Sequence, residues 1–223
     1  MNKFLLPTLL LLTVNLNNLP NQAQTIKKIS TQQTFSWRNF TLALLSKKPP
    51  IQPRKRGSRD PVSVCMISPD APTEHRIVWS DRPTFIWKGS VQKIAVRLAG
   101  SQEDLWSQTV AGMQSTNYTG KALQPGQTYE WLAFENESPS KFVQFQVMDA
   151  QQRDRITTYL NSLENQGKTK KVDNEAIALA KASYFVQNQL WVDALQQVYS
   201  VEKPSGELTQ IRQEIPDKLC SSQ

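Results

Sequence analysis

Short runs of alternating hydrophobic and polar residues between positions 61 and 148 predict an all-β domain. The alternation is clear in KIAVRLA (93–99) and KFVQFQV (141–147). Successive side chains of a strand point to opposite faces, so one face of each run belongs to a core. Further candidate strands lie at 62–67, 75–79, 83–88, 104–110, 117–120 and 128–134. We therefore expect a β-sandwich over residues 61–148.

The phrase LQPGQTYEW predicts a structural corner inside this domain. Leu123 would end one strand, Pro125 and Gly126 would turn the chain, and Tyr129 would begin the next strand two residues before Trp131. This order resembles the tyrosine corner of immunoglobulin-like and fibronectin type III-like domains, whose phenol bonds to nearby backbone. The resemblance implies that the sandwich at 61–148 is an immunoglobulin-like antiparallel β-sandwich. We favour core packing for these aromatic residues and those of PTFIW, with a ligand platform as the alternative.

After residue 148 the hydrophobic period becomes helical, which predicts a C-terminal helical subdomain over residues 149–223. Asp149 is a candidate N-cap of a first helix, and Gly167 with a Lys-rich turn should end it. The segments 174–189 and 190–202, divided by a break at Asn188-Gln189, have the spacing of a single tetratricopeptide-like hairpin. A lone hairpin cannot bury its apolar face, so we expect it to pack on the sandwich or on the flanking helices. The fold class is thus α+β.

The N-terminal residues MNKFLLPTLLLLTV predict a secretory signal peptide over residues 1–23, because the apolar run is too short to span a bilayer. The protein is then secreted or periplasmic. Residues 24–60 are predicted to be a basic, Pro-containing linker that is largely disordered. Within it, TFSWRNFTLALLSKK (34–48) can form an amphipathic helix that lies in a membrane interface, docks on the folded domain or stays mobile.

Charge is concentrated in the first part of the chain. The formal net charge is +7, but all 19 acidic residues lie at or after Asp60, where 16 Lys and Arg leave a net charge of −3. This distribution argues against a nucleic-acid partner. A solvated linker or a weak electrostatic tether to a membrane surface or wall polymer explains the basic cluster. The cluster consists of Lys47, Lys48, Arg54, Lys55, Arg56 and Arg59.

Candidate chemistry is sparse. Cys65 and Cys220 are the two cysteines, and in an oxidising compartment they predict one disulfide, with two unpaired thiols as the alternative. His75 is the one histidine, so the familiar zinc sites are excluded, and an exposed edge position is favoured over a general base. Nucleophile-elbow and dinucleotide-binding motifs are absent from the sequence. We therefore expect no cofactor, no metal and no catalytic residue.

The pieces RKRGSRDPVSVC, SDRPTFIW, LQPGQTYEW and NQLWVDALQQV occur in this order along residues 54–200. Together they resemble the cyanobacterial exported family designated domain of unknown function 928. In that family a Gly-Ile-Trp-Tyr-Asp-Ala-Leu phrase is usual where this chain has NQLWVDAL. The resemblance implies an architecture and an exported location. It implies no catalytic residue, because the family has no established activity.

These observations lead to three hypotheses. The first is a non-enzymatic exported protein that binds another macromolecule of the cell envelope, with a protein as the preferred partner. Its candidate contacts are Trp191, Asp193 and Leu195 of the hairpin and Trp106 of the run at 104–110, and core packing is the alternative for both tryptophans. The second is a module that binds carbohydrate or an anionic wall polymer. The third is a hydrolase, which requires His75 to line a cleft with a carboxylate.

Overall fold

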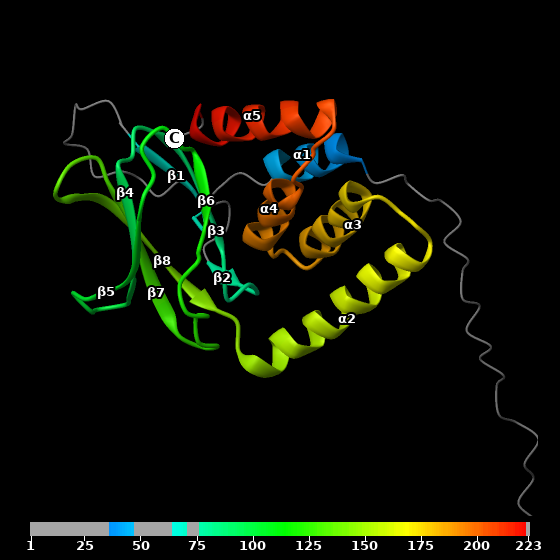
Figure 1. Cartoon of the computed structure of the whole chain (residues 1–223), viewed down its shortest axis with the longest axis horizontal. Helices are drawn as coiled ribbons and strands as arrows, with labels where there is room; N and C mark the ends of the chain where they lie inside the picture. Colours follow the sequence, from blue (N-terminus) through cyan, green and yellow to red (C-terminus); the bar gives the residue numbers. More distant parts are fainter. Residues whose placement is uncertain (1–35, 47–63, 71–75, 222–223) are drawn as a thin grey trace, which may run out of the picture. The chain divides into compact units, whose positions relative to one another are not determined.

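The computed structural model describes residues 36–46, 64–70 and 76–221. The predicted signal peptide and His75 lie outside the described residues, as do all six residues of the basic cluster. The described elements belong to one compact unit that extends from Thr34 to the C-terminus. They form two β-sheets and five helices, so the class is α+β with a sandwich-like pair of sheets (Figure 1).

The larger sheet has five strands in the order β2-β8-β7-β4-β5. Its strands pair antiparallel except β2, which runs parallel to β8. Their bounds are β2 (Ile77–Val78), β4 (Lys93–Leu98), β5 (Asp104–Thr109), β7 (Thr128–Phe134) and β8 (Pro139–Val147). The predicted alternation holds: on β8, Val143, Phe145 and Val147 are buried while Gln144 and Gln146 are exposed. Most buried side chains of this sheet face the smaller sheet, whereas Ala95, Leu132 and Phe134 form a separate cluster.

The smaller sheet lies between the larger sheet and the helices. Its order is β1-β3-β6, with bounds β1 (Val64–Ser68), β3 (Thr84–Gly89) and β6 (Ser115–Asn117). Met66, Phe85 and Trp87 join the core shared with the larger sheet, whereas Cys65 and Ile86 join the core of the helices. Because both faces are covered, β1 has no exposed residue, and its continuous apolar run VCMI replaces the usual alternation. The strand predicted at 117–120 is wrong, since β6 ends at Asn117.

The phrase LQPGQTYEW forms the predicted tyrosine corner. The backbone N–H of Gln124 donates a hydrogen bond of 2.8 Å to the phenol oxygen of Tyr129. Gly126 has a φ of +76°, a left-handed conformation that glycine adopts without strain. Tyr129 and Trp131 are buried, so this aromatic cluster is core and the ligand-platform alternative does not hold for it. Leu123, however, lies in a loop and not at the end of a strand.

Four helices follow β8: α2 (Ala150–Thr169), α3 (Asn174–Gln187), α4 (Trp191–Ser200) and α5 (Gly206–Ser221). Asp149 caps α2 as predicted, because its carboxylate accepts from the backbone N–H of Gln152 at 3.0 Å. The predicted interruption is confirmed in the Lys-rich turn, because α2 ends at Thr169 with Lys170 as its C-cap, although Gly167 itself lies inside the last turn of the helix. A Cβ at Gly167 would lie 2.7 Å from Cγ1 of Ile177, so the glycine allows α2 and α3 to approach closely. No helix in the described part of the chain is long and apolar enough to cross a membrane.

The first helix, α1 (Trp37–Ser46), corrects the assignment of residues 24–60 to a largely disordered linker. Trp37, Phe40 and Leu44 are buried in the core of the helices. Figure 1 shows α1 alongside α5, and it also contacts α3. Of the three roles considered for residues 34–48, docking on the folded domain is therefore the one observed for α1. The apolar face of α1 supplied the signal, but the sequence did not show which surface would cover it.

The predicted disulfide joins Cys65 of β1 to Cys220 in the last turn of α5. The two Cα atoms are 6.1 Å apart, and 155 residues separate the cysteines in the sequence. The bond therefore closes a loop that contains nearly the whole described structure. It fastens the C-terminal helix to the small sheet, next to the face that carries Ile67 and Ile86.

Candidate binding cleft

The residues predicted to contact a partner are mostly part of the core. Trp191 is 3% exposed, Asp193 1% and Leu195 0%, and all three lie at the start of α4 where it packs on the sheets and on α3. Trp106 is half-buried on β5, and its indole N–H donates to the hydroxyl of Thr119 at 3.0 Å. The three residues of α4 therefore pack in the core and present no surface to a partner.

Asp193 has a structural role that connects α4 to the segment after β2. One carboxylate oxygen accepts from the backbone N–H of Trp79 at 2.8 Å, and the other accepts from that of Ser80 at 3.0 Å. Nearby, the guanidinium of Arg153 on α2 donates to the carbonyl of Trp79 and pairs with Asp81. Burial raises the pKa of Asp193 to about 7 despite these hydrogen bonds. A polar joint therefore fastens two helices to the sheets.

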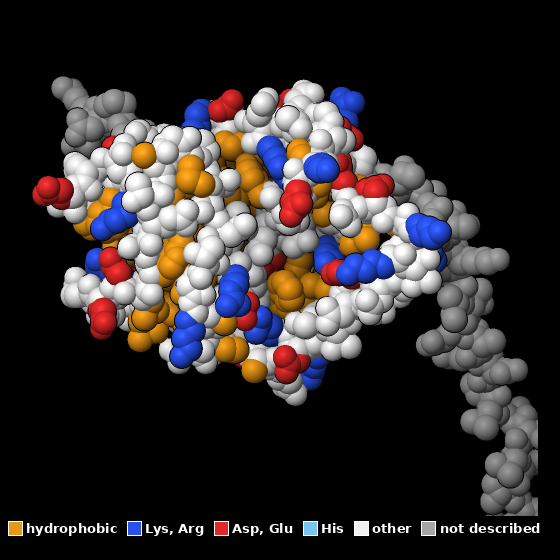
Figure 2. Space-filling model, in the orientation of Figure 1, with side chains coloured by type: hydrophobic (Ala, Val, Ile, Leu, Met, Phe, Trp, Pro, Cys, Tyr) orange, Lys and Arg blue, Asp and Glu red, His pale blue; other side chains and the backbone are white. Residues whose placement is uncertain are grey.

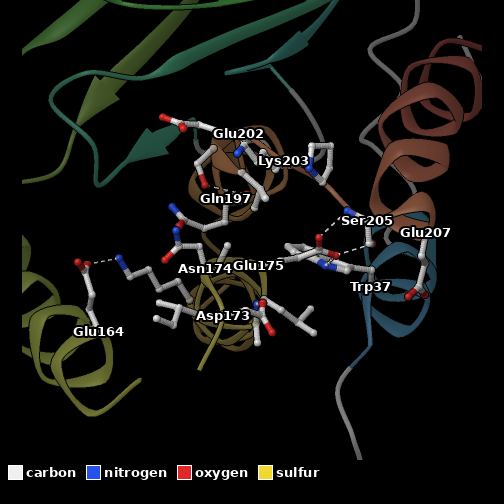
Figure 3. A pocket seen from close by; sticks show the side chains of 18 of the residues that line it. Trp37, Glu164, Asp173, Asn174, Glu175, Gln197, Glu202, Lys203, Ser205 and Glu207 are labelled. Carbon is white, nitrogen blue, oxygen red and sulfur yellow. Dashed lines mark hydrogen bonds and ion pairs between the residues drawn. The ribbon is translucent and has the colours of Figure 1, made fainter. Parts of the chain in front are cut away.

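An open cleft of about 1100 Å³ lies among the helices. The C-terminal half of α2, the N-terminal half of α3 and the end of α4 form its walls, together with the turn at 201–205 and the start of α1 (Figure 3). Its ionisable side chains are five carboxylates and three lysines, a formal net charge of −2. They are Glu164, Asp173, Glu175, Glu202 and Glu207 against Lys168, Lys181 and Lys203.

Glu164 pairs with two of these lysines on one wall. Its two oxygens lie 2.6 Å from Nζ of Lys168 and 2.6 Å from Nζ of Lys181. The hydrogen bonds from both ammonium groups hold the pKa of Glu164 at about 2, so the carboxylate stays ionised at neutral pH. A group that does not accept a proton near neutrality is a poor general base, and we assign Glu164 an electrostatic role.

Glu175 organises the opposite wall. One carboxylate oxygen accepts from the indole N–H of Trp37 at 3.0 Å and from the hydroxyl of Ser205 at 2.7 Å. The other oxygen accepts from the backbone N–H of Ser205 at 2.6 Å. Figure 3 shows these groups converging from α1, α3 and the turn before α5. The wall is thus preorganised by one carboxylate that connects three segments distant in sequence.

The rim of the cleft carries charges that face solvent. Glu202, Lys203 and Glu207 are exposed around the turn between α4 and α5. Among the described residues no group of three or more His, Cys, Asp or Glu side chains is placed to hold a metal ion. What the cleft offers is a set of fixed carboxylates and ammonium groups beside the apolar side chains of Ile177 and Leu179.

The sequence alone does not indicate this cleft. Glu164 and Lys181 are 17 residues apart, and Trp37 lies 138 residues before Glu175. No local motif joins such pairs, because the α2–α3 crossing and the docking of α1 bring them together. The buried pattern of α3 and α4 predicted the hairpin, but it did not indicate which polar residues would face each other across the helices.

Models of known protein families gave no match to this chain, and curated proteins gave none either. The resemblance to the domain of unknown function 928 family is neither confirmed nor contradicted by this result.

Proposed function

We propose that this protein is an exported, non-enzymatic binding module of the cell envelope that takes a segment of a protein partner into the helical cleft. The observation that carries this proposal is the open cleft of about 1100 Å³ whose walls are preorganised by Glu164 and Glu175. Concave sites of this size with a few fixed polar groups are the usual locations for ligand binding. No catalytic residue and no cofactor form part of the proposal.

The chemistry of the cleft favours a basic partner segment. Its lining has a formal net charge of −2, and Glu202 and Glu207 are exposed at the rim. Complementary charge steers such a segment toward the cleft and selects against acidic ones. Outside the cleft, Figure 2 shows Lys and Arg interspersed with Asp and Glu on the face that is drawn. Mixed signs support a protein partner over a polyanion such as nucleic acid.

Export is supported by the predicted signal peptide and by the disulfide between Cys65 and Cys220. Disulfides persist in oxidising compartments, so a secreted or periplasmic location accommodates this one. The basic cluster at 47–59 remains a candidate for weak contact with a membrane surface or a wall polymer. The tyrosine corner and the parallel pairing of β2 with β8 support an immunoglobulin-like assignment of the two sheets.

Site-specific photo-crosslinking in the native envelope tests the function. A photoreactive phenylalanine analogue replaces Glu207 at the cleft rim in one variant and Gln144, an exposed residue of β8, in the control. We expect position 207 alone to give a covalent adduct with a discrete envelope protein, identified by mass spectrometry. Identical adducts at both positions, or none at position 207, would contradict a partner in the cleft.

Affinity for a peptide from the crosslinked segment provides the second arm. Fluorescence anisotropy should show that Glu202→Lys weakens binding by about fivefold, since an exposed charge pair contributes up to about 1 kcal/mol. Glu137→Lys reverses an exposed carboxylate of the β7–β8 turn and serves as the matched control. Equal affinities for the two variants would show that the adduct formed outside the cleft.

A further inference from the structure

A second surface, on the outer side of α2, has a chemistry unlike that of the cleft. Of the 20 residues of α2, Leu160 is the one whose side chain is buried. A helix of this length is about 30 Å long, at 1.5 Å per residue. Most of that length is therefore open to solvent along one side of the molecule.

This side of α2 carries a shallow hollow of about 580 Å³. Six of its seven lining residues have neutral hydroxyl or amide side chains, the seventh is Lys170, and none is acidic. The neutral residues are Thr158, Asn161, Ser162, Asn165, Gln166 and Thr169. All six are exposed. We call this set the amide-hydroxyl stripe.

Two amides of the stripe, those of Asn161 and Asn165, are available for a ligand, whereas the amide of Gln166 donates to the hydroxyl of Ser162 at 3.2 Å. The side chains of Asn161 and Asn165 make no hydrogen bond with any other residue that the structure describes, and each amide offers both a donor and an acceptor. The hydroxyls of Thr158 and Thr169 donate to the backbone of their own helix, which leaves their oxygens able to accept. The stripe thus presents hydrogen-bond donors and acceptors without a fixed charge.

An exposed aromatic ring borders this stripe. Tyr159 stacks on Tyr184 of α3 with ring centroids 4.4 Å apart and an interplanar angle of 26°. Tyr184 covers one face of the ring, yet Tyr159 remains 49% exposed. Ser162 and Gln166 follow Tyr159 by three and seven residues, so helical periodicity places them beside it on the same side of α2. The ring of Tyr159 therefore lies next to the neutral polar groups of the amide-hydroxyl stripe.

We propose that Tyr159 and the amide-hydroxyl stripe form a binding site for a neutral polysaccharide chain. A sugar ring presents C–H bonds on one face, which pack against the electron-rich face of an aromatic ring. Its hydroxyls, each a donor and an acceptor, match the amides and hydroxyls of the stripe. The length of α2 accommodates several sugar rings in a row.

A protein partner fits this surface less well. The centres of protein–protein interfaces are enriched in aromatic and apolar residues and depleted in serine, whereas six neutral polar residues line this hollow. The hollow also differs from the negatively charged cleft, because it has no carboxylate and has Lys170 at its end. The two surfaces share no residue, so this inference is independent of the proposed function.

Isothermal titration calorimetry of the full chain with neutral hexasaccharides tests the site. The probes are hexasaccharides of α-linked glucose, β-linked glucose and β-linked N-acetylglucosamine. We expect at least one to bind with a Kd below about 1 mM, and Tyr159→Ala to weaken that binding by about tenfold. Tyr159→Phe should bind as the wild type does, because the ring face is retained.

The control is Phe142→Ala, which removes an exposed aromatic ring of β8 and should leave sugar binding unchanged. Thermal unfolding of Tyr159→Ala separates lost binding from loss of the fold. A further variant, Asn161→Glu, keeps the backbone and adds a negative charge to the stripe, and it should weaken binding without loss of stability. No heat with any of the three sugars, or equal affinity in the wild type and Tyr159→Ala, would overturn the proposal.

Discussion

Replacement of Asp193 by asparagine should change the pH dependence of stability. The carboxyl pKa is raised to about 7 in the folded protein, against about 3.9 in an unfolded chain. Between these values the folded state binds more protons than the unfolded state, so the free energy of unfolding falls as pH rises. At 1.36 kcal/mol per pKa unit, the fall amounts to about 4 kcal/mol between pH 4 and pH 8.

Other carboxylates act in a different pH window. Glu164 has its pKa lowered to about 2 by Lys168 and Lys181, so its contribution is present above its unfolded pKa and is lost as pH falls toward 2. The contribution of Asp193 changes above pH 4, where it lowers the free energy of unfolding as pH rises. Subtracting the unfolding free energy of Asp193→Asn from that of the wild type at each pH isolates Asp193, because Glu164 is present in both proteins.

Urea unfolding under non-reducing conditions, at intervals from pH 4 to pH 8, measures this difference. The asparagine amide leaves one of the two backbone N–H groups of Trp79 and Ser80 without an acceptor, at a cost of about 1 to 3 kcal/mol. The variant should therefore be less stable than the wild type at pH 4, with the deficit shrinking or reversing toward pH 8. Asp193→Ala, which also lacks the carboxyl, should show the same pH trend. A difference that stays constant across the range would refute the argument.

Three further predictions follow from particular contacts. The double replacement Cys65→Ser and Cys220→Ser should lower the free energy of unfolding by about 5 kcal/mol in the chain-entropy description, because the bond closes a loop of 155 residues. Urea unfolding of the wild type with and without reductant checks this value. A change in the free energy of unfolding below about 1 kcal/mol would contradict it. Tyr129→Phe should lower the free energy of unfolding by about 1 kcal/mol, because it removes the acceptor of the Gln124 N–H. Tyr118→Phe should lower it by less, since the Tyr118 hydroxyl makes no hydrogen bond among the described residues. Gly167→Ala should destabilise despite a helix propensity gain of about 1 kcal/mol, since the new Cβ meets Ile177. A double-mutant cycle with Ile177→Ala checks this, because the destabilisation by Gly167→Ala should disappear when the Ile177 side chain is removed. An unchanged destabilisation would show that contact with Ile177 is not its cause.

Local pattern predicted most of the secondary structure. The period-two alternation of β4 and β8, the Asp149 cap and the hairpin at 174–200 could all be predicted, because each depends on residues close together in the chain. Gly167 shows where such reasoning fails. A glycine has the same sequence signature whether it ends a helix or lets a neighbouring helix approach, and only the position of Ile177 distinguishes the two.

The candidate binding residues show the same limit. Trp191, Asp193 and Leu195 are predicted contacts because they belong to the helical hairpin, but α4 buries all three in the core. A helical period identifies an apolar face without saying what covers it. The cleft and the α2 surface went unpredicted because Glu164 meets Lys181, and Tyr159 meets Tyr184, across the crossing of two helices.

The sequence by itself determined the order of strands and helices, the tyrosine corner and the pair of cysteines that join in the structure. These features arise from backbone sterics and from hydrophobic periodicity, which act over a few residues, and from a cysteine count of two. The tertiary structure alone decided that α1 completes the helical core, that Asp193 is enclosed, and that Glu164 meets Lys181 across the crossing of α2 and α3. Such outcomes depend on contacts between residues far apart in the chain, which burial of apolar surface selects collectively and no local pattern records.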